Sequence, residues 1–327
     1  MNRRTLAWLV LNHLPGAGAV TLRRLASRFG SPEAALTAPV EELAAIGSLS
    51  AAQVRELSRL VADLPRIEQL AANLERAGTR LLALEDGSYP DNLRALRDAP
   101  PLLYLRGTLA PEDEAAVAIV GTRTPSNAGE SVTAAMAQAL ALRGVTVVSG
   151  LARGVDAAAH RGALAAKHLA VAGERILTAG RTVAILGSGI DRITPPQHRG
   201  LADHIAGSGA LLSEVAPGTP ATRETLLARN RIQAGLSKAV IVVQCRHRGG
   251  SFVTAKRALA EGRPVFAVLW EEAEFAEGAR RLQAMGAPAV SATEAMELAA
   301  AAAFKPLPPT PQREMALGDS GYPGRGE

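Results

Sequence analysis

From about residue 80 to residue 269, short apolar, largely β-branched runs alternate with stretches of helical period. The apolar runs are 80–84, 102–105, 116–120, 145–149, 182–186, 210–213, 239–243 and 264–269. The helical patterns lie between them at about 127–143, 156–175, 199–206, 224–235, 251–261 and 277–285. Near-continuous apolar strands separated by helices are typical of a parallel sheet that is covered on both faces. The pattern therefore predicts an α/β fold with a mostly parallel, doubly wound sheet.

The first 78 residues lack this alternation and predict an all-helical segment. Ser31 followed by Pro32 marks a helix start, and Ser50 marks another. Glycine turns at 15–18 and 46–50 each lead into a helix, which suggests a helix–hairpin–helix arrangement that points amides at phosphates. Only the first turn has close basic neighbours, so a small helical bundle without a ligand remains an alternative. We predict domains at 1–78 and 79–290. For 291–327 we expect a helix and a disordered Pro/Gly-rich tail, with no winged helix.

Composition limits the class of protein. Hydrophobic residues make up 47% of the chain and charged residues 20%, as in globular proteins. The single cysteine, Cys245, excludes an internal disulfide and indicates a reducing, cytoplasmic compartment. The apolar run near the N-terminus faintly resembles a secretory signal, but Asn12, His13 and Pro15 interrupt it, and a first amphipathic helix is expected instead. We expect no membrane association.

Four of the predicted strands are followed by loops of similar chemistry. The loops contain Gly121-Thr122-Arg123, Ser149-Gly150 with Arg153, Gly187-Ser188-Gly189, and Arg246 to Ser251. Glycine lets the backbone approach an oxyanion, hydroxyls and amides donate hydrogen bonds, and arginine binds phosphate bidentately. In a doubly wound sheet ligands bind beyond the carboxyl ends of the strands. The four loops together predict a phosphate-binding surface.

The charge of the chain agrees with a polyanionic partner. The net charge is +5, and the segment 223–257 holds eight basic residues against the single acid Glu224. These basic residues are Arg223, Arg229, Arg231, Lys238, Arg246, Arg248, Lys256 and Arg257. A solvated basic helix face would give the same composition. Aromatic residues are only 3% of the chain, so few side chains are available to stack on unpaired bases.

Motifs for catalysis or cofactors are missing from the sequence. No Walker A motif occurs, and Gly187-Ser188-Gly189 lacks the third glycine of the dinucleotide fingerprint. The six histidines show no metal-ligand spacing. Asp156 and His160 share a helix face and could form an acid–base pair, but a helix-capping Asp156 beside a structural His160 is the favoured interpretation. We therefore predict a binding protein without enzymatic activity, cofactor or metal.

Several of these motifs, in this order, resemble the DprA/Smf family of DNA-processing proteins. The resemblance covers about 85–270 and rests most on Ser149-Gly150-Leu151-Ala152-Arg153-Gly154-Val155-Asp156-Ala157-Ala158-Ala159-His160 and on Arg229-Asn230-Arg231-Ile232. It implies an extended Rossmann-like fold after a sterile-alpha-motif-like helical domain. It also implies a homodimer that binds single-stranded DNA, protects it, and helps to load the RecA recombinase in natural transformation.

The loops and the resemblance together define a set of expected DNA-binding residues. These residues are Gly121, Thr122, Arg123, Ser126, Ser149, Gly150, Arg153, Gly187, Gly189, Arg229, Asn230, Arg231, Gly250, Ser251 and Thr254.

The chain departs from the family pattern at several positions. Leu226-Leu227 replace a usual Phe-Pro, which puts a stacking contact with a base in doubt. Gln244 replaces a usual acid, Gly249 a serine and Thr194 a tyrosine, and about a dozen residues around 167–178 look inserted. An enzyme or sensor for a nucleotide-derived phosphate ligand is the alternative function, and a scaffold that has lost its ligand is a third.

Overall fold

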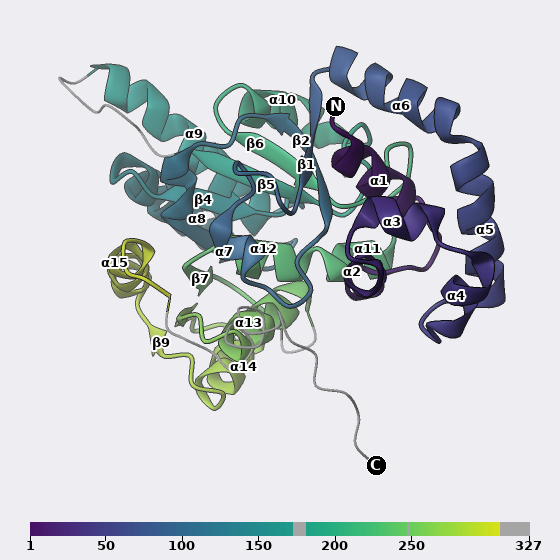
Figure 1. Ribbon diagram of the computed structural model, residues 1–327. Helices are drawn as coiled ribbons and strands as arrows, with labels where there is room; N and C mark the ends of the chain where they lie inside the picture. Colours follow the sequence, from purple (N-terminus) through teal and green to yellow (C-terminus); the bar gives the residue numbers. More distant parts are fainter. Residues whose placement is uncertain (173–180, 247–248, 308–327) are drawn as a thin grey trace. The chain divides into compact units, whose positions relative to one another are not determined.

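The computed structural model describes residues 1–172, 181–246 and 249–307, with residues 168–172 described as helix backbone only (Figure 1). The predictions for the disordered tail and the missing winged helix, for the second half of the insertion and for Arg248 lie outside these residues. The chain forms two compact units. The first comprises Met1–Tyr89 with Arg97–Arg106, and the second comprises Pro90–Leu96 with the chain from Gly107 onward.

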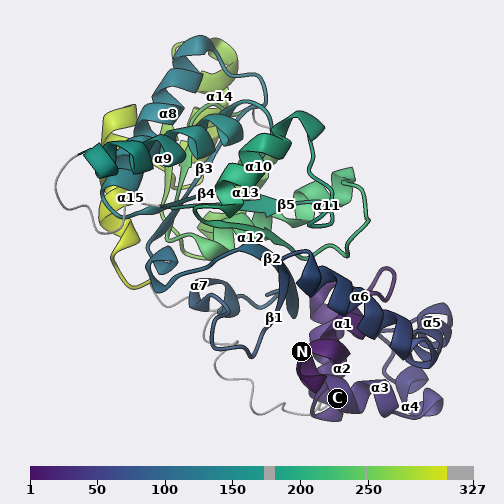
Figure 2. The same cartoon turned by 90° about the horizontal axis from the view of Figure 1, so that it is seen from above.

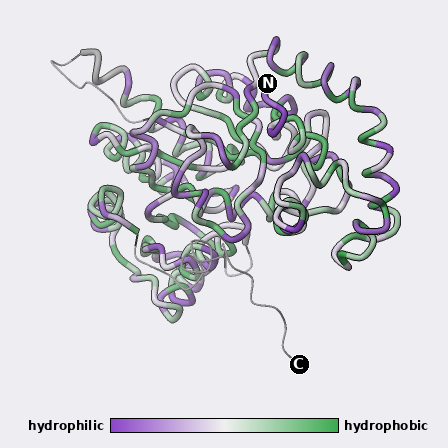
Figure 3. The backbone as a smooth tube through the Cα atoms, in the orientation of Figure 1, coloured by the Kyte–Doolittle hydropathy of each residue, from purple (hydrophilic) through white to green (hydrophobic). Residues whose placement is uncertain are grey.

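The first unit consists of helices and one antiparallel strand pair. Its elements are α1 (Arg3–Asn12), α2 (Ala19–Phe29), α3 (Pro32–Thr37), α4 (Val40–Ala45), α5 (Ala51–Ala62), α6 (Leu64–Arg76), β1 (Thr79–Ala83) and β2 (Leu102–Gly107). The predicted caps are confirmed, because Ser31 accepts a hydrogen bond from the Ala34 amide and Ser50 forms a reciprocal capping box with Gln53. Hydrophilic and hydrophobic residues alternate along α5 and α6, as expected of amphipathic helices (Figure 3). The helix–hairpin–helix and sterile-alpha-motif assignments stay predictions.

The second unit contains the parallel sheet. Its strands are β3 (Ala116–Val120), β4 (Thr146–Ser149), β5 (Thr182–Leu186), β6 (Ala210–Ser213), β7 (Ala239–Val242), β8 (Val265–Val268) and β9 (Ala289–Val290). They lie in the order β6-β5-β4-β3-β7-β8-β9, and each neighbouring pair is parallel. The predicted mostly parallel α/β fold is confirmed. The strand order reverses between β3 and β7, which makes this the position where a doubly wound sheet opens a crevice.

Helices cover both faces of this sheet. The longer ones are α8 (Asn127–Leu142), α9 (Val155–Ala172), α10 (Arg199–Ala206), α11 (Arg223–Ala228), α12 (Asn230–Leu236), α13 (Gly250–Ala260), α14 (Ala273–Gln283) and α15 (Ala292–Ala303). Short helical turns are α7 (Asp91–Arg94), η1 (Pro111–Glu114) and η2 (Pro196–His198). Figures 1 and 2 show α8 and α9 together on one side of the sheet and α12 on the other. The core between the sheet and α8, α9 and α15 is built from alternate residues of the strands, such as Val117 and Ile119 of β3.

The predicted helix at 224–235 is two helices. α11 ends at Ala228 and α12 begins at Asn230, with Arg229 between them. The Arg229 side chain is buried and donates hydrogen bonds to the carbonyls of Gly150 and Ile185. Helical period alone could not show where the first helix ends and the second begins.

Among the described residues, no helix has both the length and the hydrophobicity needed to cross a membrane.

The contact between α8 and α9 offers a test of this packing. A Cβ atom added to Gly162 on α9 would lie 2.2 Å from the Ala134 carbonyl oxygen on α8, whereas one added to Gly200 on α10 would meet nothing within 4 Å. We expect Gly162→Ala to lower the free energy of unfolding by about 1–3 kcal/mol through overpacking. Gly200→Ala, the matched control, should be neutral or stabilising by up to about 1 kcal/mol, because alanine is the better helix former. Urea unfolding of both variants checks this, and equal stability of the two would contradict the close approach of α8 and α9.

Candidate nucleic-acid interface

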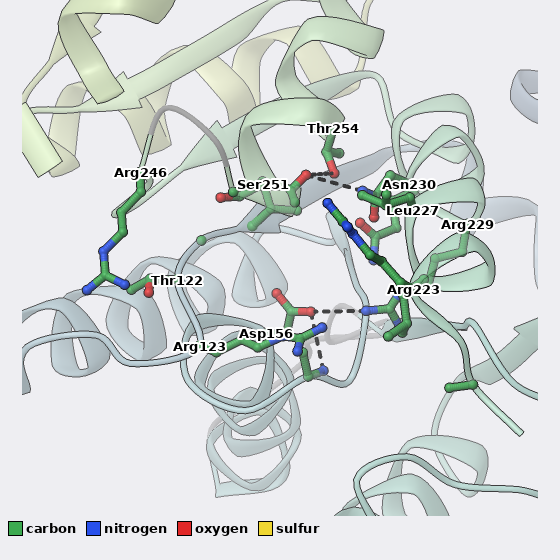
Figure 4. A pocket seen from close by; sticks show the side chains of 18 of the residues that line it. Thr122, Arg123, Asp156, Arg223, Leu227, Arg229, Asn230, Arg246, Ser251 and Thr254 are labelled. Atoms are coloured by element: carbon green, nitrogen blue, oxygen red, sulfur yellow. Dashed lines mark hydrogen bonds and ion pairs between the residues drawn. The ribbon is translucent and has the colours of Figure 1, made fainter. Parts of the chain in front are cut away.

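A pocket of about 620 Å³ lies beyond the carboxyl ends of β3 and β7, at the reversal of strand order (Figure 4). Four segments build it: the loop after β3, the segment from the β4–α9 loop into α9, the loop that leads from β7 into α13, and the stretch from Ala221 through α11 into α12. The lining residues are Val120, Gly121, Thr122, Arg123, Thr124, Ala152, Asp156, Ala221, Thr222, Arg223, Leu226, Leu227, Arg229, Asn230, Gln233, Arg246, Gly249, Gly250, Ser251 and Thr254. The pocket therefore joins segments more than a hundred residues apart.

More than half of the expected site residues line this pocket. They are Gly121, Thr122, Arg123, Arg229, Asn230, Gly250, Ser251 and Thr254. Two lining arginines, Arg223 and Arg246, are not among the expected site residues, although the basic composition of 223–257 points to them. Asp156 and Gln233, which line the buried part, are also absent from the expected set. No sequence motif marks a buried glutamine as a pocket residue.

The other expected residues lie nearby but do not line the pocket. Ser149 is fully buried and donates its hydroxyl hydrogen bond to the Ile119 carbonyl at 2.7 Å. Ser126 caps α8, and Arg153 is exposed outside the lining set. Arg231 forms an ion pair with Glu214, with nitrogen–oxygen distances of 2.5 and 2.9 Å. In these conformations the Ser149 hydroxyl and the Arg231 guanidinium each already bind another group of the protein.

Four of the expected glycines are required by contacts within the protein. A Cβ atom at Gly121 would collide with Val155, and one at Gly187 would come within 2.9 Å of Leu226. At Gly150 it would collide with Gln233 and Arg229, and Gly189 is equally enclosed. Gly250 differs, because the nearest atom to such a Cβ is 3.8 Å away. Of the expected glycines, only Gly250 both lines the pocket and leaves space beside its backbone.

The loop after β3 is held by Gln244. The Gln244 side-chain oxygen accepts from the Ser126 amide at 3.0 Å, and its nitrogen donates to the Ser126 hydroxyl at 2.9 Å. The Gln244 carbonyl also accepts from the Thr122 amide at 2.7 Å. The side-chain amide thus satisfies both groups of Ser126, and the backbone carbonyl holds Thr122 at the pocket.

The rim of the pocket is positively charged. Arg123 and Arg223 are exposed, and neither forms an ion pair with any residue that the structure describes. Arg246 lies on the same rim and pairs with Glu274 on α14 at 2.9 Å. The N-terminus of α13, which begins at Gly250, adds the positive end of a helix dipole. This arrangement attracts anions.

The inner part of the pocket contains a buried arginine. Arg229 is 6% exposed, donates to the carbonyls of Gly150 and Ile185, and lies 3.9 Å from the Asp156 carboxylate. Burial raises the pKa of Asp156, and the charge of Arg229 opposes that rise. Burial likewise lowers the pKa of Arg229, while Asp156 raises it. The pair ties the ends of β4 and β5 to the start of α9.

His160 lies in the same buried region and has a structural partner. Its Nδ1 is 2.7 Å from the Thr182 hydroxyl, which itself donates to the Val147 carbonyl. Since the single hydroxyl proton is used, His160 Nδ1 carries the hydrogen of this bond. Burial and the neighbouring charges of Arg229 and His198 lower the pKa of His160 to about 3. His160 is therefore held neutral. In the described part of the chain, no three His, Cys, Asp or Glu side chains gather as metal ligands would.

Comparison with known proteins identifies the family of this chain. The family model described as DNA recombination-mediator protein A matches residues 80–300. A Smf protein from Synechocystis sp. is 35% identical over 274 residues, which are 82% of this chain and 65% of that protein. The chain thus spans just under two thirds of that relative's length.

Two solved structures are similar in fold. The structure of DNA processing protein A (DprA) from Streptococcus pneumoniae gives a TM-score of 0.72 at 27% identity, covering 91% of this chain and 98% of that one. The structure of DNA processing protein A from Helicobacter pylori gives a TM-score of 0.56 at 27% identity, covering 67% and 94%, and its description refers to a single-stranded DNA binding mode.

The doubly wound, mostly parallel sheet with an arginine-rimmed pocket at its strand-order reversal defines a Rossmann-like α/β protein. More specifically, the chain belongs to the DNA recombination-mediator protein A family, the family of DprA and Smf.

The buried pair predicts a stability effect. We expect Arg229→Met to lower the free energy of unfolding by about 3–5 kcal/mol, because it leaves the Asp156 carboxylate buried without its partner. The double variant Arg229→Met with Asp156→Asn should show a smaller loss of unfolding free energy, because it contains no buried carboxylate without a partner. Urea unfolding of the three proteins measures this, and a loss of under about 1 kcal/mol in the single variant would rule out an important pair.

The lowered pKa of His160 predicts a pH effect. The folded protein binds the His160 proton more weakly than the unfolded chain, whose histidine has a pKa near 6.5. Stability from this group is therefore present above about pH 6.5 and is lost as the pH falls toward 3, at about 1.4 kcal/mol per pH unit. His160→Asn should be less sensitive to acid over this window in urea unfolding. Asp156 acts in the opposite direction in both proteins, so their difference isolates His160, and parallel pH profiles would refute the assignment.

Proposed function

We propose that this pocket binds the sugar–phosphate backbone of single-stranded DNA. The observation that carries the proposal is the meeting of Arg123, Arg223 and the α13 N-terminus at the strand-order reversal. Guanidinium groups bind phosphate oxygens bidentately, and helix N-termini bind anions. The single-stranded DNA binding mode of the Helicobacter pylori relative supports the same ligand.

The size of the pocket favours a single strand. The major groove of a DNA duplex is by itself about 12 Å wide, so a double helix cannot enter a pocket of about 620 Å³. One strand can pass its phosphates along the exposed rim arginines. Thr122 and Ser251 add hydroxyl donors beside them. Contacts of this kind depend on charge and release counterions, so affinity falls steeply with salt.

The wider role follows from the family. We propose that the chain acts as a cytoplasmic homodimer that protects incoming single strands and passes them to a RecA-type recombinase in natural transformation. The family description as a recombination mediator supports a role in binding and transfer rather than catalysis. The domain division at 78 and 290 belongs to the same proposal.

A salt-titrated binding assay tests the ligand. Fluorescence anisotropy should show tight binding of a labelled oligonucleotide single strand, weaker binding of the matching duplex, and little competition by nucleoside monophosphates. Stronger binding of the monophosphates, with release of free base on incubation, would favour the alternative of a nucleotide-directed enzyme.

The rim arginines give the mutational prediction. We expect Arg123→Ala and Arg223→Ala each to weaken binding by about tenfold and to reduce the slope of log K against log salt by about 0.7, the value for one single-strand phosphate contact. Arg280→Ala is the matched control, because Arg280 is an exposed arginine on α14 outside the pocket. Equal losses in all three variants would show that only net charge matters and that the pocket is not the site.

A further inference from the structure

The buried part of the pocket contains a side-chain amide without a hydrogen-bond partner. Gln233 on α12 is 2% exposed and lines the pocket. Its backbone carbonyl accepts from the Ser237 hydroxyl, but its side-chain amide makes no hydrogen bond to any residue in the described ranges. Although the residue is buried as a whole, its amide atoms are not sealed from solvent, so they are open to the pocket and can exchange water for a ligand.

The surroundings of Gln233 are shaped to hold the amide there. A Cβ atom at Gly150 would lie 2.3 Å from the Gln233 side-chain nitrogen. Any other residue at position 150 would therefore displace the amide or the backbone. The glycine after β4, expected from the sequence to face an oxyanion, thus provides the space for this side chain.

The polar groups of the pocket fall into two levels. Arg123, Arg223 and Arg246 are exposed at the rim, whereas Asn230, Gln233 and Thr254 are neutral and at least nine-tenths buried. The Asn230 amide and the Thr254 hydroxyl both donate to the Gly250 carbonyl, each at 3.2 Å. Gln233 is the neutral group among these whose donor and acceptor both remain for a ligand.

The chemistry of the amide selects the part of the ligand that it can bind. An amide both donates and accepts, whereas a phosphate diester only accepts. Within a DNA strand, the groups that present a donor beside an acceptor are the edges of the bases. A pocket of about 620 Å³ is within the range that encloses ligands as large as a nucleotide.

We propose that Gln233 hydrogen-bonds the edge of one base that enters the pocket, and that this contact gives the protein a base preference. The inference rests on the proposed function and deepens it. Phosphates bind at the charged rim and set the affinity, while one base reaches the amide and sets the specificity. Leu226 and Leu227 on α11 line the same pocket and offer apolar contact to the base faces.

The experiment compares Gln233→Leu with the wild-type chain. Leucine has a similar shape and no hydrogen-bonding group. Dissociation constants are measured at one salt concentration for oligo(dT), oligo(dC), oligo(dA) and an abasic oligonucleotide of the same length. Because each oligonucleotide is compared between two proteins, stacking within the free strand cancels. Gln283→Leu, which removes an exposed amide at the end of α14, is the matched control.

We expect the wild-type protein and Gln283→Leu to prefer one homopolymer over another by about fivefold or more, and over the abasic strand. Gln233→Leu should reduce that spread to about twofold with an unchanged salt dependence. Its melting temperature without DNA should stay close to that of the wild type, because leucine has a similar shape and the substitution removes no hydrogen bond that the described residues make.

Other outcomes separate the inference from the proposed function. If Gln233→Leu keeps the base preference, if the wild-type protein binds the abasic strand as tightly as the best homopolymer, or if the variant melts at a lower temperature, the inference is overturned while single-strand binding stands. If the wild-type protein binds none of the oligonucleotides, the proposed function fails, and this inference fails with it.

Discussion

The buried guanidinium of Arg229 is the interaction on which the pocket depends. It donates to the carbonyls of Gly150 and Ile185, at the ends of β4 and β5, and its charge is balanced by Asp156 at the start of α9. An arginine can lose its water only where such acceptors surround it. The side chain that the family motif suggests as a phosphate ligand therefore connects the ends of β4 and β5 and the start of α9 to the junction between α11 and α12.

This interior pair explains the distribution of charge in the pocket. Asp156 is the acid among the lining residues, and its charge is opposed by Arg229. The positive potential at the opening then comes from Arg123, Arg223 and the start of α13. Because these groups remain in water, they can exchange solvent for phosphate with a small desolvation cost. The buried Arg229 therefore stabilises the structure of the site, whereas the exposed Arg123 and Arg223 are accessible to a ligand.

Much of the fold could be predicted from the pattern of residues. The apolar runs at 116–120, 182–186 and 210–213 coincide with β3, β5 and β6. The four loops singled out by composition follow β3, β4, β5 and β7, which are adjacent in the sheet. Their proximity was a reasoned expectation, because parallel strands present their carboxyl ends at one edge. The two-residue strand β9 was missed, since so short a segment carries no period.

The site was harder to predict than the fold, and the reason is physical. Residue type and spacing determined that glycines, hydroxyls and arginines would gather at the carboxyl edge of a parallel sheet, because strand period and chain direction are local properties. Only the tertiary structure decided which arginine is buried against Asp156, which glycines serve packing, and that Gln233 faces the pocket without a partner. Burial and pairing are set by contacts between segments such as those at 121, 150, 229 and 250, which are remote in the chain and meet only when it is folded.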